Sequence, residues 1–275
     1  MIGSRWTRTP ALVLAALLAV VATTMPAAAG EDDGQRYHLA LGDSLAYGFQ
    51  GFKVGQPPSA FNTGYADLLA AQLQHGHRSP TLVNYGCPGE TTETFATGPC
   101  PWSAAGFALH DTFTGPQLDA AVQFLRAHRG RVDLVTVSLW GNDANAFVAS
   151  CNGDVQCVID GAPAAIARVA GNLRAALQTL RRAAPDTELV VIGAYDANLG
   201  AFALTGPIFT SLNQAMAGAA RSARAAYVDP MPIFDADGGT ALCTYTLLCR
   251  DRDAHPSDAG YAVLAQLAEA ALKPY

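Results

Sequence analysis

Four short segments of the chain hold residue types that together could attack a carbonyl carbon. A serine hydroxyl is a weak nucleophile and needs a general base within hydrogen-bond reach. Ser44 is the candidate nucleophile, and His255 is the candidate base that would take its proton and return it to a leaving alcohol. In chain order, the segments are Gly42-Asp43-Ser44, Asn84 to Thr92, Ser138 to Asp143 and Asp251 to Ser257.

The same segments supply donors for the negative charge that such an attack would place on the carbonyl oxygen. Gly89 has no side chain, so its backbone N–H can approach a substrate closely. Asn142 offers an amide N–H that does not ionise. Together with the backbone N–H of Ser44, these groups would form an oxyanion hole with three donors.

In content and order, the four segments resemble the four blocks of the SGNH hydrolases, also called GDSL esterases and lipases. The resemblance spans most of the chain, and it implies Ser44 as nucleophile, His255 as base, and Ser44, Gly89 and Asn142 as oxyanion donors. It also implies a three-layer α/β/α sandwich and a carboxylic ester hydrolase that uses no cofactor and no metal. The Cys-Pro-Gly-Glu-Thr run in the second block looks most like secreted actinobacterial-type esterases and lipases.

The last block departs from the family pattern, in which an Asp stands three residues before the His. Arg252 occupies that place, whereas Asp253 and Asp251 stand two and four residues before His255. The imidazole needs an acceptor at Nδ1 so that Nε2 stays free for the Ser44 proton. Two acceptors are open: the Asp253 carboxylate, which is our first choice as third catalytic residue, or a backbone carbonyl from residues 243–251.

Alternating apolar runs and helical patterns predict the elements that position these residues. Short apolar runs bounded by turn residues predict strands, and longer segments with helical spacing predict helices. Their alternation favours βαβ units, and five strands suit a flavodoxin-like parallel sheet covered by helices on both faces. The predicted strands are Tyr37–Leu41, Thr81–Tyr85, Leu134–Leu139, Glu188–Ala194 and Ala226–Val228, and the predicted helices are Tyr65–Gln74, Gln117–His128, Ala164–Ala183, Ile208–Ala223 and Asp258–Leu272.

Two segments, Glu90–Thr114 and Ala144–Pro163, are predicted as long loops. Both follow a predicted strand, at the edge where open α/β sheets bind ligands. Long loops in compact domains are usually functional. Their aromatic residues could line an acyl or aromatic pocket, or could pack the loops onto the body: Phe95, Trp102, Phe107, Phe113 and Phe147.

The first 29 residues have the layout of a secretory signal peptide. Arg5 and Arg8 precede the apolar run Ala11–Ala22, and Ala27–Ala29 offers a small-residue cleavage site. We therefore expect residues 1–29 to be removed and a single secreted domain to cover residues 30–275. The apolar run is too short to span a bilayer comfortably, so we expect no stable membrane insertion.

The charge of the chain excludes some partners. The whole chain has a formal net charge of −6, and loss of Arg5 and Arg8 leaves 15 basic against 23 acidic residues, or −8. An acidic chain without a basic run is a poor candidate for binding nucleic acid or anionic membranes. We expect a monomer that acts on a small-molecule or lipid ester.

All six cysteines follow the expected signal peptide, and an even number in an exported chain is typical of disulfides. Their spacings match no common zinc pattern, so we expect no metal site. Sequence alone does not fix the connectivity. Because the cysteines form three close pairs in loop-like stretches, we expect Cys87–Cys100, Cys151–Cys157 and Cys243–Cys249.

Other functions stay open beside a general esterase or lipase. A carbohydrate acetylesterase or a phospholipase would use the same site. A non-catalytic flavodoxin-like binding module is a further alternative. A flavin site would need a phosphate-cradling loop after the first strand, and the chain places Asp43 there instead.

Overall fold

Runs rich in Val, Leu and Ile form the central sheet, as their apolar character predicts for strands buried on both faces. The computed structural model describes residues 1–3, 34–75, 79–198 and 202–272. All five strands are parallel, and their order, β2-β1-β3-β4-β5, is the flavodoxin-like order. The strands are β1 (Tyr37–Gly42), β2 (Thr81–Asn84), β3 (Val132–Ser138), β4 (Glu188–Ile192) and β5 (Ala226–Val228).

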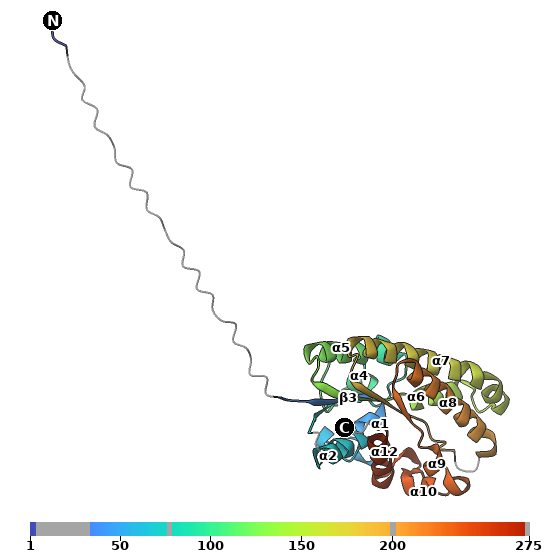
Figure 1. Cartoon of the computed structure of the whole chain (residues 1–275). Helices are drawn as coiled ribbons and strands as arrows, with labels where there is room; N and C mark the ends of the chain where they lie inside the picture. The colour runs from blue at the N-terminus through green and yellow to red at the C-terminus, as the bar shows by residue number, and fades with distance from the viewer. Residues whose placement is uncertain (4–33, 76–78, 199–201, 273–275) are drawn as a thin grey trace. The chain divides into compact units, whose positions relative to one another are not determined.

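Helices cover both faces of the sheet (Figure 1). On one face, α7 (Val155–Ala183) packs against both α5 (Gln117–Ala127) and α8 (Phe202–Ser222). Helices α2 (Tyr65–His75) and α12 (Asp258–Ala270) pack together on the other. The predicted three-layer α/β/α sandwich is therefore confirmed.

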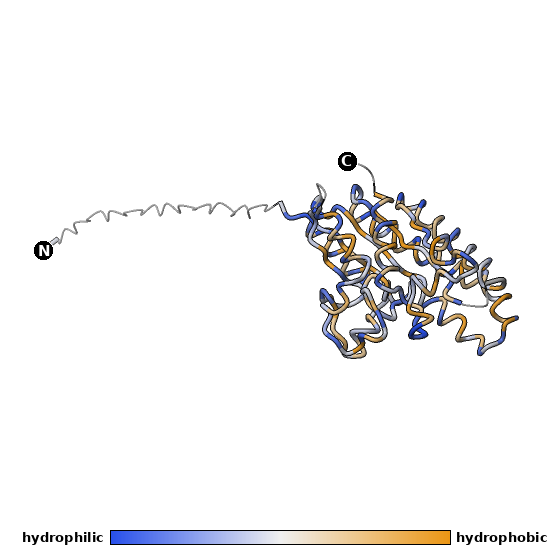
Figure 2. The backbone as a smooth tube through the Cα atoms, turned by 90° about the horizontal axis from the view of Figure 1, so that it is seen from below, coloured by the Kyte–Doolittle hydropathy of each residue, from blue (hydrophilic) through white to orange (hydrophobic). Residues whose placement is uncertain are grey.

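The spacing of apolar residues explains how the helices attach to the sheet. In α7, Val169, Leu173, Leu177 and Leu180 are all buried and recur every three or four residues. This spacing places them on one side of the helix, facing the core. The change between apolar and polar residues along the backbone is visible in Figure 2. Each fully buried Leu contributes about 1.5–3 kcal/mol through removal of its surface from water.

The prediction of a loop over Ala144–Pro163 is wrong. Most of that segment is helical, because α6 (Gly141–Ser150) occupies its start and α7 begins at Val155. Asp154 caps α7 by accepting the backbone N–H of Gln156 at 2.9 Å, which supports a new helix soon after α6 ends. Pro163 looks like a helix breaker but lies inside α7, where it removes one backbone hydrogen bond.

The remaining elements are short. The predicted loop Glu90–Thr114 holds only α3 (Thr94–Thr97) and α4 (Pro101–Ala104). A small antiparallel pair, β6 (Thr246–Leu247) with β7 (Asp253–Pro256), precedes α12 and is absent from the sequence prediction. The other short helices are α1 (Ser44–Tyr47), α9 (Met231–Phe234), α10 (Leu242–Tyr245) and α11 (Leu248–Asp251), with 3₁₀ turns at Gly51–Lys53, Pro58–Phe61 and Ala236–Gly239.

Three disulfides hold these irregular segments, and they join the cysteines in sequential pairs. Cys151–Cys157 closes the corner between α6 and α7, and Cys243–Cys249 joins α10 to α11 just before β7. Cys87–Cys100 joins the segment that follows β2 to the start of α4, and its two sulfurs lie close to the Glu90 carboxylate. Since both sulfurs are bonded to each other, this group is not available to bind a metal.

The expected signal peptide lies almost wholly outside the described residues, so its removal stays a prediction. Gly34–Tyr275 forms one compact unit. Within the described part of the chain, no helix is long and apolar enough to cross a membrane.

Candidate active site

Strands β1 and β3 bring the first and third sequence segments together. The two strands are adjacent, with Gly42 paired to Ser138 at their carboxyl ends. The strand order reverses direction between them, and ligands of open α/β sheets bind outside the carboxyl ends at such a point. Ser44 is the first residue of the helix that follows β1, and Asn142 is the second residue of α6, which follows β3.

A sharp turn after β1 carries Ser44. Gly42 has a φ of +122°, and a Cβ there would lie 2.0 Å from the Ser138 carbonyl oxygen, so only glycine fits. Asp43 then caps α1, because its Oδ1 accepts the Leu45 N–H at 3.0 Å and the Ser138 hydroxyl at 3.1 Å. Burial raises the pKa of Asp43 to about 6, against these hydrogen bonds, which lower it. Asp43 thus braces the turn that presents Ser44.

His255 bridges Ser44 and Asp253. Its Nε2 lies 2.8 Å from the Ser44 Oγ, and its Nδ1 lies 2.5 Å from the Asp253 Oδ1. The other carboxylate oxygen of Asp253 accepts the Gly51 N–H at 2.7 Å. Partial burial opposes ionisation of Asp253, but its hydrogen bonds and its attraction to His255 outweigh that effect and lower its pKa to about 2. Asp253 is therefore an ionised partner for the imidazole.

The unusual spacing of the last block follows from its strand conformation. Residues two apart in a strand point to the same side, so Asp253 and His255 lie side by side on β7. Arg252, which occupies the place of the family's Asp, has a left-handed φ of +58° and ends α11. Asp251 instead pairs with the exposed guanidinium of Arg250, at 2.6 Å.

Several hydrogen bonds position the segment around His255. The Tyr195 hydroxyl donates to the Ala254 carbonyl at 2.7 Å, and the Gln50 amide donates to the Pro256 carbonyl at 3.2 Å. The Phe49 ring lies 4.7 Å from the imidazole, measured between ring centroids. These contacts hold the backbone before and after His255 and pack an aromatic ring against its imidazole.

A tight turn in the second segment carries Gly89. The Glu90 N–H donates to the Cys87 carbonyl at 3.0 Å, with Pro88 and Gly89 between them and a φ of +88° at Gly89. A type II turn requires a positive φ at this place and favours Pro before it. The Asn142 amide nitrogen donates one hydrogen to the Glu90 carbonyl at 2.9 Å, which ties the two candidate oxyanion segments together.

Gln117 connects the nucleophile turn to the second segment, and sequence reasoning missed it. This buried side chain bonds both backbone groups of Gly42, accepting its N–H at 2.6 Å and donating to its carbonyl at 3.0 Å. Its amide also donates to the Glu90 Oε2 at 3.0 Å. A glutamine that begins an ordinary amphipathic helix carries no local signal of such contacts.

The buried carboxyl of Glu90 gives a testable effect on stability. Burial raises its pKa to about 7, so between its ordinary pKa and pH 7 the folded protein binds more protons there than the unfolded chain. Folding free energy therefore becomes less favourable as pH rises through this window. Glu90→Gln keeps an acceptor for Gln117 but cannot titrate. We expect the free energy of unfolding of this variant, relative to that of wild type, to rise by about 2–3 kcal/mol from pH 5 to pH 8.

Urea unfolding of both proteins at the two pH values measures this gain. Exposed Glu93 provides the matched control, and Glu93→Gln should follow wild type at both pH values. An equal difference between Glu90→Gln and wild type at pH 5 and pH 8 would show that Glu90 does not titrate in this range.

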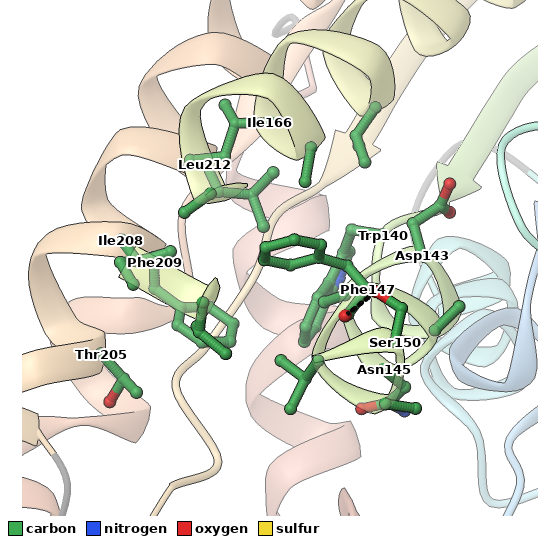
Figure 3. Close-up of a pocket in the computed structure, with 18 of the residues that line it drawn as sticks. Trp140, Asp143, Asn145, Phe147, Ser150, Ile166, Thr205, Ile208, Phe209 and Leu212 are labelled. Carbon is green, nitrogen blue, oxygen red and sulfur yellow. Dashed lines mark hydrogen bonds between the residues drawn. The ribbon is translucent and has the colours of Figure 1, made fainter. Parts of the chain in front are cut away.

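A cavity of about 790 Å³ lies between α6, α7 and α8 (Figure 3). Thr91 and Asp143, which neighbour the candidate oxyanion residues, contribute to its wall, whereas Ser44 and His255 do not. Asp143 accepts both the N–H and the hydroxyl of Thr92, at 2.8 and 2.7 Å, and so braces this side of the site. The cavity therefore lies next to the segments that carry the candidate oxyanion donors Gly89 and Asn142.

The five loop aromatics divide between cavity and packing. Phe147 lines the cavity. Trp102 stacks on Phe107 at 4.0 Å and also contacts the Phe49 ring beside His255. Phe95 is fully buried in the core, and Phe113 packs on Tyr85.

The fold is shared with solved structures of lipases and esterases at low sequence identity. An extracellular lipase from Streptomyces rimosus superposes with a TM-score of 0.60 at 18% identity, over 86% of this chain and 100% of that one. Phospholipase A1 from Streptomyces albidoflavus NA297 gives 0.59 at 19%, over 86% and 100%. A catalytic mutant of an acetylxylan esterase from Geobacillus stearothermophilus gives 0.55 at 14%, over 84% and 91%.

No curated protein sequence matches the chain significantly. Residues 40–263 do match the profile of the GDSL-like Lipase/Acylhydrolase family, and this range contains all four sequence segments. The chain therefore belongs to the GDSL-like lipase/acylhydrolase family of carboxylic ester hydrolases.

Proposed function

We propose that the protein is a secreted serine esterase or lipase that hydrolyses carboxylic esters through an acyl-enzyme on Ser44. The observation that carries the proposal is the hydrogen-bonded line from Ser44 through His255 to Asp253, with contacts of 2.8 and 2.5 Å. A nucleophile, a base and a group that orients the base are the parts that acyl transfer needs.

In the first half of the reaction, the Ser44 Oγ attacks the ester carbonyl carbon while the Nε2 of His255 takes the hydroxyl proton. The ionised Asp253 stabilises the imidazolium that forms. The backbone N–H groups of Ser44 and Gly89 and the free amide hydrogen of Asn142 stabilise the oxyanion. The bond to the leaving oxygen then breaks, and His255 passes its proton to the departing alcohol.

In the second half, a water molecule attacks the acyl-enzyme carbonyl. His255 takes a proton from the water and returns it to the Ser44 Oγ as the acid leaves. The same donors stabilise the second oxyanion. Neither half requires a cofactor or a metal ion.

The proposal of secretion is supported by the layout of residues 1–29 and by the three disulfides. The fold that the chain shares with an extracellular lipase agrees with it. We propose a mature, monomeric enzyme of one domain over residues 30–275, acting on small-molecule or lipid esters without stable membrane insertion.

Reaction with a fluorophosphonate probe and hydrolysis of p-nitrophenyl esters test the function. We expect the purified protein to hydrolyse the esters and to carry the probe on the peptide that contains Ser44, as read by mass spectrometry. A folded protein that neither takes up the probe nor hydrolyses any ester would contradict the proposal and favour a binding module.

Asn142→Ala tests the oxyanion hole. The amide stabilises charge that exists only in the transition state, so we expect kcat to fall by roughly 10²–10³ with little change in KM. Steady-state kinetics on a p-nitrophenyl ester measure both constants. Asn62→Ala, at an exposed position outside the cavity between α6, α7 and α8, is the control and should keep kcat. A change in KM alone would mean that Asn142 binds substrate and is not an oxyanion donor.

A further inference from the structure

We propose that the cavity between α6, α7 and α8 binds the acyl chain of the substrate, and that the preferred substrate is a lipid ester with a long unbranched acyl chain. The inference rests on the proposed function, because it places the reacting carbonyl between Ser44 and the two oxyanion donors. It adds that the acyl part of the substrate enters the cavity and that this part is a long, unbranched chain.

The position of the cavity links it to the oxyanion donors. Its wall includes Thr91, two residues after Gly89, and Trp140, two residues before Asn142. Residues two apart have Cα atoms within about 7 Å of each other. A carbonyl oxygen held by Gly89 and Asn142 therefore lies near the cavity wall, within reach of a long substituent on that carbonyl.

The substituent that enters is the acyl chain and not the alcohol. His255 must protonate the leaving alcohol, so the alcohol has to depart on the side of the imidazole. No residue of the segment from β6 through β7, which carries His255, lines the cavity. The imidazole instead faces the Phe49 ring, which contacts Trp102, and neither aromatic residue lines the cavity. The alcohol accordingly leaves toward Phe49 and Trp102.

The chemistry of the walls selects an apolar chain. Phe147 of α6 points toward Phe209 and Ile208 of α8, and Ile166 and Leu212 close the same space (Figure 3). Clefts of this size with mainly apolar walls commonly bind small organic ligands. Each methylene removed from water there strengthens binding by up to about fourfold, so a long chain gains far more from this cavity than an acetyl group.

The shape of the cavity is built into the helices around it. Gly161 of α7 leaves room for the Phe147 ring, since a Cβ at that position would lie 2.8 Å from it. Small buried residues, including Ala176 of α7 and Ala219 of α8, lie further along the two helices, beyond the residues that line the cavity. The cavity thus occupies the space between the amino-terminal halves of α7 and α8.

The rim of the cavity is apolar and open to solvent. Val148, Val155 and Leu204 all line it, and they are 51%, 54% and 37% exposed. Exposed apolar groups gathered at one cavity are a common mark of a ligand-binding site. Substrates that present an acyl chain from a micelle or droplet would meet this rim first.

Filling the cavity tests the inference. Ala165 of α7 lines it and is only partly buried, so a tryptophan there can occupy the space with little effect on the core. We expect Ala165→Trp to lower the ratio of kcat/KM for p-nitrophenyl decanoate to that for p-nitrophenyl acetate by at least about tenfold. Ala167→Trp is the matched control, since exposed Ala167 lies on the same helix outside the cavity, and its ratio should equal that of wild type.

A second variant, Ile208→Trp, narrows the cavity from α8 and should lower the same ratio, which guards against misfolding of the first. An unchanged ratio in both folded variants would overturn the assignment. So would a wild-type enzyme that hydrolyses the acetate ester much faster than the decanoate ester. A wild-type protein that hydrolyses neither ester would contradict the proposed function itself, and the cavity assignment would fall with it.

Discussion

Ser44→Ala is expected to lower ester hydrolysis by several orders of magnitude and to leave the melting temperature close to that of wild type. Loss of a covalent nucleophile removes the acyl-enzyme route altogether, so the effect lies in kcat. The hydroxyl contributes little to the fold, because its described hydrogen bond joins it to His255 and not to the core. Activity and stability should therefore separate cleanly.

The measurement is kcat/KM on a p-nitrophenyl ester together with a thermal melt of the same sample. Ser103→Ala, at an exposed position of α4, is the control for loss of a serine hydroxyl and should retain activity. Residual Ser44→Ala activity within about tenfold of wild type would rule out Ser44 as the nucleophile.

The sheet and most of the helices could be predicted from sequence because their signals are local. The strands of a sheet buried on both faces are continuous apolar runs, and the long helices repeat apolar residues every three or four positions. Each predicted strand overlaps an observed one, with ends that differ by no more than two residues, as Leu134–Leu139 and the observed Val132–Ser138 show. The alternation of strand and helix predicted a parallel sheet, and the number of strands suited a flavodoxin-like one, as observed.

The segment between α6 and α7 could not be predicted, because two opposing signals met there. Gly153 and Pro163 are typical of loops, whereas the Asp154 cap and a small corner closed by Cys151–Cys157 favour a new helix. Tertiary contacts decide between such signals. Phe147, for example, fits against Gly161 across the corner, and this contact has no signature in either stretch of sequence alone.

The candidate site could be predicted in part, for a related reason. Ser44 and His255 belong to recognisable local blocks, but the bonds that Gln117 makes to Gly42 and Glu90 join residues far apart in the chain. The sequence at the start of α5 would predict the same helix whether or not Gln117 made these hydrogen bonds. Likewise, the spacing of the last block did not by itself identify the partner of His255. The extended conformation of β7 places Asp253, two residues before His255, beside the imidazole.

Asp253→Asn is expected to reduce kcat by about 10⁴, the effect that loss of the correct imidazole tautomer has in serine proteases. The Asp253 Oδ1 lies 2.5 Å from the Nδ1 of His255, and its low pKa keeps the carboxylate ionised throughout the neutral range. An asparagine at this place can present its amide N–H to Nδ1, which favours the tautomer with the proton on Nε2. That tautomer cannot accept the proton of Ser44.

The alternative acceptor, a backbone carbonyl from residues 243–251, predicts a different result. A carbonyl would be left in place by the substitution, and Asp253→Asn would then cost less than about tenfold. Asp251→Asn is the control for loss of a nearby negative charge, because Asp251 pairs with Arg250 and not with the imidazole. Steady-state kcat values of both variants and of His255→Ala therefore decide the question. A nearly silent Asp253→Asn beside an inactive His255→Ala would show that the enzyme works as a Ser-His dyad, with the contact between Asp253 and His255 serving only to shape β7.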